Sequence, residues 1–279
     1  MSDIFHRLAP FIQDYIYRCK WEELREIQVL AAEAVFDTDE NLLLSSGTAS
    51  GKTEAAFLPV LTRLWENPSQ SVGVLYLSPL KALINDQFVR LEGLLEEANI
   101  PITKWHGDAS AAAKKRVLKR PQGIIQTTPE SLESMLMHNS SGAYRLFSDL
   151  RFVIIDEVHY FMDNDRGLQL LCLLERLSRL IGYHPRRIGL SATLGDCRSA
   201  EQWLNTGSGR RCITPKVHEK GRTLRLSVKF FPIKEKIPNS DSKVLLQNYY
   251  DYLFESTWNK RCILFSNSKG EVEENIAHL

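Results

Sequence analysis

Apolar residues recur along the chain with two different periods, one typical of helices and the other of buried strands. Over residues 2–36 they return every three or four positions, as in Phe11, Ile12, Tyr15 and Ile16, which predicts helices, one of them beginning at Pro10. From residue 41 onward, short apolar runs alternate with longer helical ones. The expected strands are 41–45, 72–78, 102–105, 123–127, 152–155 and 187–191.

Helical patterns separate these strands, at 53–65, 81–98, 109–120, 129–138 and 167–181. Alternating strands and helices predict an α/β fold with a doubly wound, mostly parallel sheet that helices cover on both faces. The run FVII at 152–155 is apolar without alternation, as a central parallel strand should be.

The pattern changes near NTGSGR (205–210), which predicts a first domain over residues 1–210. A connecting segment is expected over 211–258, with a half-exposed strand at 223–231 and a helix at 243–254. Residues 259–279 then begin another strand, turn and helix. Because one strand and one helix cannot bury a core, we expect the chain to hold only the start of a second α/β domain.

Composition narrows the possible classes of protein. Hydrophobic residues make up 43% of the 279 residues, which argues against global disorder. The net charge of +1 gives no overall attraction to polyanions, so a nucleic-acid site must be a local patch. Five scattered cysteines without a C-x-x-C pair argue against zinc and disulfides and fit a reducing cytoplasm. The N-terminus lacks a signal-peptide core and no apolar run reaches 18 residues, so a cytoplasmic location without a membrane span is expected.

The segment 46–53, S-G-T-A-S-G-K-T, follows a strand and opens a helix, which is the context of a phosphate loop. Ser46 replaces the usual Ala or Gly with another small residue. Small residues let backbone N–H groups close around a phosphate, and the helix dipole adds to the field. Lys52 would lie along the β and γ phosphates of a nucleoside triphosphate, and Thr53 would offer its hydroxyl to Mg²⁺. The alternative is an ordinary helix start with a solvated lysine. The expected nucleotide-binding residues are Ser46, Gly47, Thr48, Ala49, Ser50, Gly51, Lys52, Thr53 and Glu54.

A second candidate is FVIIDEVH (152–159), a buried strand that ends in two acids. Ligands of parallel sheets sit at the carboxyl ends of the strands, so Asp156 and Glu157 should share an edge with Lys52. Asp156 would hold Mg²⁺, and Glu157 would orient and deprotonate the attacking water, which makes Lys52, Asp156 and Glu157 the expected catalytic residues. The alternative is two surface acids that cap the next helix.

D-E-V-H (156–159) resembles the DExH box of the superfamily 2 helicases, and S-A-T (191–193) resembles their third motif. Together with RGLQLLCLLERL (166–177) and RIGLSATL (187–194), the DEVH segment most resembles the Lhr-type (large helicase-related) group. Three further stretches resemble the glutamine motif and motifs Ia and Ib, namely LREIQVLAAEA (24–34), LSPLKALINDQ (77–87) and TTPESL (127–132). The resemblance covers 15–195 and resumes at ILFSNSKG (263–270), and it implies RecA-like domains.

The resemblance also implies residue roles. Gln28 would bind the adenine edge, and Trp21 or Phe11 would stack on the base or else belong to the core. His159, Ser191 and Thr193 would couple the phosphate site to nucleic acid and to the second domain. Five residues would contact a nucleic-acid backbone, namely Pro79, Lys81, Gly107 (in the turn His106–Asp108), Thr128 and Pro129. The basic run 113–120 is either a further contact or a solvated helix face, and Asp163–Asp165 lacks the Gly and Glu of a calcium loop.

The resemblance implies a nucleic-acid-dependent ATPase that uses ATP and Mg²⁺ to move on or unwind nucleic acid, with DNA favoured over RNA. Arginine fingers belong to later motifs of the family, so we expect the 279-residue chain alone to be weakly active. One alternative is an ATP-driven clamp or sensor in a larger complex, without processive unwinding. A small-molecule kinase is a third possibility, which the combined DEVH and SAT motifs disfavour.

Overall fold

The computed structural model describes residues 3–47, 50–80, 93–96, 98–107, 109–192, 194–218, 226–231 and 242–278. Four expected site residues lie outside these ranges, namely Thr48, Ala49, Lys81 and Thr193, and so does most of the helix expected over 81–98. The chain divides into two compact units, Met1–His218 and Glu219–Leu279. Each unit is described by itself.

The first unit is built on a seven-stranded sheet in the order β3-β4-β2-β5-β6-β1-β7, and every pairing is parallel. This confirms the predicted α/β fold with a parallel sheet. The strands are β1 (Asn41–Ser45), β2 (Val72–Leu77), β3 (Ile102–Trp105), β4 (Gly123–Thr127), β5 (Phe152–Ile155), β6 (Arg186–Ser191) and β7 (Cys212–Ile213).

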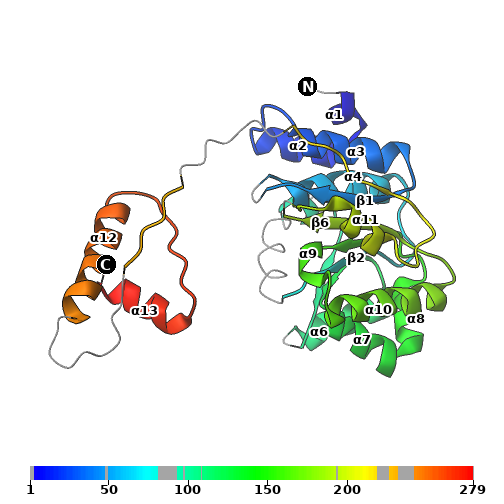
Figure 1. The fold of residues 1–279 in the computed structure, drawn as a ribbon. Helices are drawn as coiled ribbons and strands as arrows, with labels where there is room; N and C mark the ends of the chain where they lie inside the picture. The colour runs from blue at the N-terminus through cyan, green and yellow to red at the C-terminus, as the bar shows by residue number, and fades with distance from the viewer. Residues whose placement is uncertain are drawn as a thin grey trace. The chain divides into compact units, whose positions relative to one another are not determined.

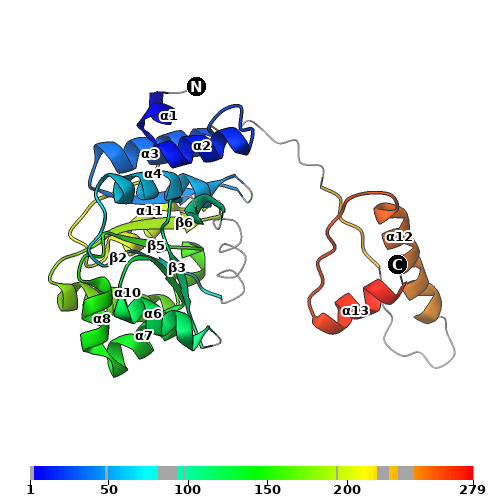
Figure 2. The same cartoon turned by 180° about the vertical axis from the view of Figure 1, so that it is seen from behind.

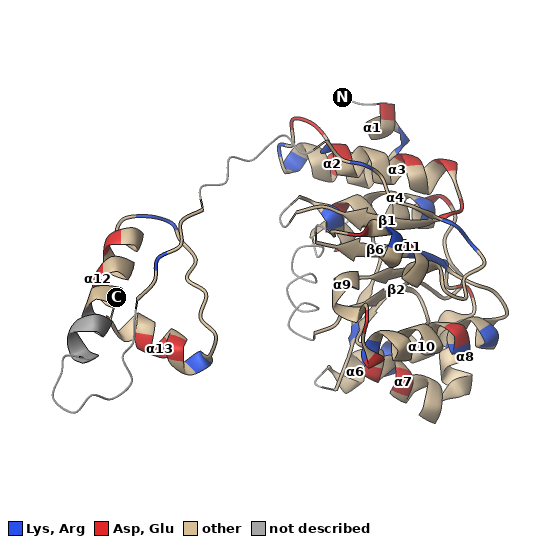
Figure 3. Cartoon of the chain, in the orientation of Figure 1, with Lys and Arg blue, Asp and Glu red and all other residues tan. Residues whose placement is uncertain are grey.

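Helices cover both faces of the sheet (Figures 1 and 2). One group is α1 (Asp3–Arg7), α2 (Pro10–Arg18), α3 (Glu26–Asp37) and α4 (Lys52–Glu66). The other group is α6 (Ala111–Lys119), α7 (Pro129–His138), α8 (Ser140–Phe147), α9 (Val158–Phe161), α10 (Asp165–Ile181) and α11 (Cys197–Asn205). Basic and acidic residues are interspersed on the helices of both groups, in keeping with a net charge of +1 (Figure 3).

Two hydrophobic cores lie on the two faces of the sheet, because successive strand residues point to opposite sides. Leu42 and Leu44 of β1 pack with α1–α4, whereas Leu43 packs with α9–α11. In β5, Ile154 belongs to the first core and Ile155 to the second. Both faces of the central strands are therefore buried, which explains their continuous apolar sequence.

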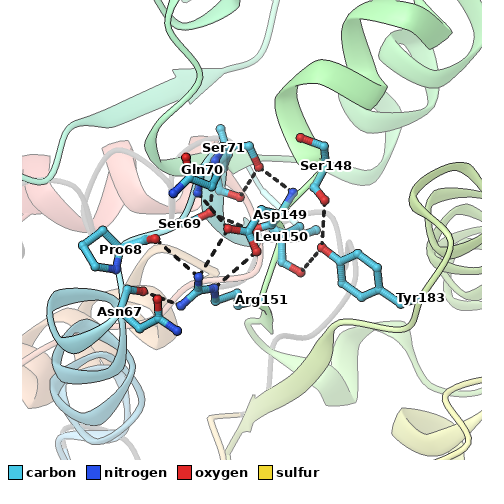
Figure 4. Close-up of polar contacts among 11 residues, drawn as sticks. Asn67, Pro68, Ser69, Gln70, Ser71, Ser148, Asp149, Leu150, Arg151 and Tyr183 are labelled. Atoms are coloured by element: carbon cyan, nitrogen blue, oxygen red, sulfur yellow. Dashed lines mark hydrogen bonds and ion pairs between the residues drawn. The ribbon is translucent and has the colours of Figure 1, made fainter.

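The amino end of β5 is tied to the loop that precedes β2 (Figure 4). Asp149 accepts a hydrogen bond from the amide of Gln70 at 2.7 Å, and its own amide donates to the hydroxyl of Ser71 at 2.8 Å. Arg151 donates to the carbonyl oxygen of Asn67 and forms an ion pair with Asp149. These contacts fix the edge of the sheet opposite to the one where the expected site residues lie.

The structure adds elements that the hydrophobic pattern does not predict. They are α8, α9, α11 and the two-residue strand β7. Because β7 pairs with Asn41 and Leu42 of β1, the sheet of the first unit extends beyond the domain boundary expected at residue 210. Asn41 is fully buried, and its amide donates to Asn205 and Ser208. The backbone amide of Asn41 also donates to the carbonyl oxygen of Arg211, directly before β7, at 2.8 Å. Backbone pairing with β1 therefore places β7, which is too short to show a period.

The second unit contains α12 (Ser242–Thr257) and α13 (Lys269–His278). The helix expected over 243–254 is confirmed. The two strands expected here are wrong for the described residues, because 226–231 and 261–266 form no ladder. A strand exists only where another backbone pairs with it, and the apolar side chains of these segments are instead exposed, such as Phe230 at 86% and Phe265 at 88%. Each described helix of the chain is too short or too polar to cross a bilayer.

Candidate active site

The carboxyl ends of six strands meet at one edge of the sheet. The register aligns Leu77 of β2 with Thr127 of β4 and Ile155 of β5, and Ser45 of β1 with Ser191 of β6. Each expected motif residue that the structure describes lies at or after one of these strand ends, apart from Gln28. In sheet order the edge carries Gly107, Thr128, Pro79, Asp156, Ser191 and Ser46. The expected nucleic-acid residues therefore lie at β3, β4 and β2, next to a second group that holds the expected catalytic, coupling and phosphate-loop residues at β5, β6 and β1.

The phosphate loop runs from β1 into α4. Gly51 has φ +87°, a left-handed conformation that favours glycine, and α4 begins at Lys52. The Lys52 ammonium donates to the carbonyl oxygens of Ser46 at 2.7 Å and Gly47 at 2.9 Å, and the hydroxyl oxygens of Ser46 and Ser50 lie 2.6 Å apart. The backbone carbonyl groups of Ser46 and Gly47 thus hold the amine of Lys52, the lysine expected to contact phosphate.

Burial lowers the pKa of Lys52, and the negative charges of Glu157 and Asp156 act in the opposite direction. These charges act on Lys52 only because β5 and β1 end at the same edge. Thr53 is buried next to Lys52 in the first turn of α4. Glu54 is half-buried in that turn. The structure therefore brings the expected lysine and the two acids into one electrostatic environment.

Gln28 reaches this loop from α3. Its side chain is 3% exposed, and Oε1 accepts the amide of Arg25 at 2.9 Å, which stabilises the start of the helix. A Cβ atom built on Gly51 would lie 3.0 Å from Nε2 of Gln28, so the glutamine packs against the phosphate loop. Phe11 and Trp21, the two candidates for base stacking, pack partly buried against the core.

Asp156 is 6% exposed, and both of its carboxylate oxygens are oriented by hydrogen bonds. The Tyr76 hydroxyl donates to Oδ2 at 2.5 Å, and the Glu157 amide donates to Oδ1 at 3.0 Å. Burial raises the pKa of Asp156, and the hydrogen bond from Tyr76 acts against that rise. The sequence does not predict this role of Tyr76, because its only signal is a single tyrosine in an otherwise apolar strand.

Glu157 has φ 51° and ψ 51°, a left-handed conformation that costs a non-glycine residue about 1–2 kcal/mol. It stands at the N-cap of α9, directly after the strand end. Strained residues of this kind are common at functional sites, where the surrounding structure enforces them. The conformation turns the chain away from the sheet immediately after Asp156.

His159 links the strand ends of β5 and β6. Its Nδ1 lies 3.0 Å from the hydroxyl of Ser191, which is fully buried, and 3.4 Å from Oε2 of Glu157. The neighbouring Ser45 hydroxyl donates to the carbonyl oxygen of Ala192 and accepts the amide of Leu194. His159 of DEVH thus contacts Ser191 of SAT, and Ala192 of SAT contacts Ser45 of β1.

The expected nucleic-acid residues begin at β2, the strand next to β5. Thr128 is 4% exposed at the N-cap of α7, and Pro129 is the first residue of that helix. Pro79 is buried after β2, whereas Gly107 is exposed in the turn after β3. Lys114 of the basic run donates to the carbonyl oxygen of His106 at 2.6 Å. The other cations of that run, Lys115, Arg116, Lys119 and Arg120, are exposed.

The chemistry of the donors at this edge fits Mg²⁺. Asp156 provides an oriented carboxylate and Thr53 a hydroxyl, and Mg²⁺ is usually held by one or two protein oxygens together with substrate phosphates and waters. The described residues contain no cluster of three His, Cys, Asp or Glu side chains that could hold a metal by themselves.

Comparisons with known proteins agree with this geometry. Residues 25–201 match the family model described as DEAD/DEAH box helicase. The chain is 32% identical to the ATP-dependent helicase Lhr-Core of Methanothermobacter thermautotrophicus and 34% identical to that of Methanocaldococcus jannaschii. Both matches cover 100% of this chain and 34% of the relative, so the chain spans about a third of these relatives.

Solved structures are similar as well. A Mycobacterium smegmatis helicase Lhr bound to ssDNA and AMP-PNP has a TM-score of 0.76 at 29% identity, over 99% of this chain and 36% of that one. The DUF1998 helicase MrfA bound to DNA has a TM-score of 0.66 at 27% identity, over 77% of this chain and 30% of that one. The resemblance to the Lhr-type group that the motifs indicate is thereby confirmed.

Proposed function

The chain belongs to the DEAD/DEAH box helicase family, and we propose that it is the ATP-binding part of a motor that moves along or unwinds nucleic acid. The observation that carries this proposal is the order of residues along the sheet edge. The expected phosphate-loop and catalytic residues follow β1 and β5, and the expected nucleic-acid residues follow β2, β3 and β4. The expected coupling residue Ser191 ends β6, between β5 and β1. One rigid sheet therefore supports both groups.

In the proposed reaction, the loop from Ser46 to Thr53 binds the phosphates of ATP, and Lys52 exchanges its carbonyl partners for phosphate oxygens. Glu157 orients a water and accepts its proton as the water attacks the γ-phosphorus, while the bond from that phosphorus to the oxygen bridging the β-phosphate breaks and ADP leaves. Asp156 and Thr53 would hold Mg²⁺, which neutralises charge on the phosphates. The two hydrogen bonds to Asp156 fix its orientation before ligands arrive, which supports this role.

His159 and Ser191 would transmit the state of the phosphate site. Their 3.0 Å contact connects the segment after Glu157 with the end of β6. In this proposal Gln28 selects adenine, and residues 259–279 begin the second RecA-like domain. The match to helicase Lhr extends over 99% of this chain and supports that assignment.

Pro79, Lys81, Gly107, Thr128 and Pro129 would contact the phosphates and sugars of the track, so little sequence specificity is expected. DNA is the favoured track, because the similar structures of Lhr and MrfA are bound to ssDNA and DNA. The alternative, a clamp or sensor, would bind the same polymer with ATP but would not separate strands.

Strand displacement by the intact protein separates the two functions. Forked duplexes of DNA and of RNA are incubated with Mg²⁺ and ATP, and Glu157→Gln is the inactive control. A motor displaces the strand only with ATP and only in the wild type. Tight ATP-dependent binding without displacement would favour the clamp and contradict the motor.

A further inference from the structure

Arg166 lies where the segments that follow the neighbouring strands β4, β2 and β5 meet. Its Nε donates to Oε1 of Glu130 at 2.7 Å, and a terminal nitrogen donates to the carbonyl oxygen of Pro79 at 2.7 Å. Pro79 follows β2, Glu130 lies in the first turn of α7 after β4, and Arg166 lies in the first turn of α10. One guanidinium therefore joins the two turns that carry Pro79 and Thr128.

The same guanidinium also contacts the helix that follows the DEVH acids. Its central carbon lies 5.6 Å from the ring centroids of both Tyr160 and Phe161. Both rings belong to α9, which begins immediately after Glu157. A planar guanidinium suits this combination, since it stacks on aromatic rings while it donates hydrogen bonds in its own plane.

Backbone geometry fixes the start of α10 against α9. A Cβ atom on Gly167 would lie 1.6 Å from the carbonyl oxygen of Phe161, so only glycine allows this approach. Asn164 accepts the amide of Gly167 at 3.0 Å and donates to the carbonyl oxygen of Tyr160 at 2.9 Å. The backbone of Arg166 is therefore held against α9, which follows Glu157, while its side chain extends toward the segments after β2 and β4.

A second contact one turn further along repeats the arrangement. Gln169 of α10 donates to Glu133 of α7 at 2.6 Å, so the pairs Arg166–Glu130 and Gln169–Glu133 hold the two helices in register. Partial burial acts to raise the pKa of Glu130, but hydrogen bonds from Arg166 and Thr128 outweigh it and leave the pKa below its ordinary value. Glu130 is thus charged at neutral pH.

We propose that Arg166 is a positioning residue that sets the spacing between the Pro79 turn and the amino end of α7. This spacing determines how well two neighbouring phosphates of a nucleic-acid strand fit the edge. The inference rests on the proposed function. Arg166 itself would contact neither ATP nor the polymer, since it acts through Pro79 and Glu130.

The test compares Arg166→Gln, Arg166→Lys and Glu130→Gln in the intact protein. Arg179→Gln is the matched control, because Arg179 lies on the same helix and pairs with Glu175 at 2.8 Å near its other end. Three quantities are measured: the single-stranded DNA concentration that half-saturates ATP turnover, the dissociation constant by fluorescence anisotropy, and its dependence on salt. Basal turnover and melting temperature are recorded for every variant.

Arg166→Gln should raise the half-saturating DNA concentration about tenfold, which corresponds to about 1.4 kcal/mol. Arg166→Lys should lie between wild type and Gln, because a point charge cannot make both hydrogen bonds in one plane. Glu130→Gln should shift the value in the same direction, and the double variant should be no worse than Arg166→Gln. Basal turnover and the Arg179→Gln control should stay within about twofold of wild type, and the salt slope should not change.

Two results would overturn the proposal alone. The first is that DNA stimulates ATP turnover by the wild type, but the half-saturating DNA concentration of Arg166→Gln equals that of the wild type. The other is a salt slope that falls by about one, which would make Arg166 a direct phosphate contact. A wild type that no polymer binds or stimulates would overturn the proposed function as well. If Arg166→Gln does not fold, Glu130→Gln carries the test, since it weakens the same ion pair from α7.

Discussion

The hydroxyl of Tyr76 in β2 donates a hydrogen bond of 2.5 Å to Oδ2 of Asp156, the residue that directly follows the neighbouring strand β5. Because Glu157 provides the second donor, the carboxylate cannot rotate without losing a bond in a buried site. A buried acceptor that loses its partner costs about 1–3 kcal/mol. The orientation of Asp156 is therefore part of the folded sheet.

Replacing Tyr76 by Phe should weaken the response of the protein to Mg²⁺. The ring still fills the core, but Oδ2 loses its donor, so the carboxylate is no longer held in one orientation. The Mg²⁺ concentration that half-saturates ATP turnover should rise about fivefold, and stability should fall by about 1 kcal/mol. Tyr183→Phe is the control, since that hydroxyl bonds to the carbonyl oxygen of Leu150 at the opposite edge. An unchanged Mg²⁺ titration would contradict the orienting role.

Two substitutions of Glu157 should separate chemistry from backbone strain. Glu157→Gln should lower ATP turnover by at least about 100-fold without a large change in stability, because the amide cannot accept the proton. Glu157→Gly should be equally inactive but more stable by about 1 kcal/mol, since glycine adopts φ 51° without the steric cost. Chemical denaturation and ATP turnover measure both effects. A glycine variant less stable than the glutamine variant would show that the conformation is unstrained.

His159→Ala and Ser191→Ala should have the same effect, because each removes one end of the same 3.0 Å contact. We expect the stimulation of ATP turnover by nucleic acid to fall about tenfold or more in both variants, and more than basal turnover does. The double variant should resemble either single one, as residues in one interaction are not additive. Additive losses would show that the two residues act separately.

The contacts of Asp149 predict a pH-dependent contribution to stability. Burial acts to raise its pKa, but the Gln70 amide and the Arg151 guanidinium outweigh burial, so the pKa lies below the ordinary 3.8 (Figure 4). The folded state then binds this proton less readily than the unfolded state. The contribution is present above pH ~4 and is lost as the pH falls through the lowered pKa.

Asp149→Asn should therefore lower the free energy of unfolding at pH 7 by less than about 1 kcal/mol, since the group is partly exposed. The difference from wild type should persist from pH 7 to about pH 5 and shrink below about pH 4. Urea denaturation at several pH values measures it. A difference that is the same at every pH would assign the effect to shape and not to charge.

Six of the seven strands could be predicted to within about one residue, because buried parallel strands are short, apolar and bounded by turns. The strands expected at 223–231 and near 262 fail because alternation describes one strand and does not provide a partner backbone. β7 has the partner strand that those segments lack, but its sequence does not predict a strand. Its two residues show no period, and its place depends on a pairing with Asn41, far away in the sequence.

The phosphate loop and the DEVH acids are visible in the sequence because each is a local motif beside its own strand. Tyr76 and Arg166 are not, because their partners are distant: Asp156 lies 80 residues from Tyr76, and Pro79 lies 87 residues from Arg166. Only the strand order β4-β2-β5 brings these pairs together. Positioning residues therefore require the sheet, whereas the residues that they position can be found from spacing.

Steady-state ATP turnover by the intact protein tests the central claim most directly, with single-stranded DNA, duplex DNA and single-stranded RNA added separately and Glu157→Gln as control. A nucleic-acid motor predicts strong stimulation by one of these polymers, with DNA favoured, and none in the control. Turnover that no polymer changes would contradict the motor, because the two groups of residues on the sheet edge would then be uncoupled.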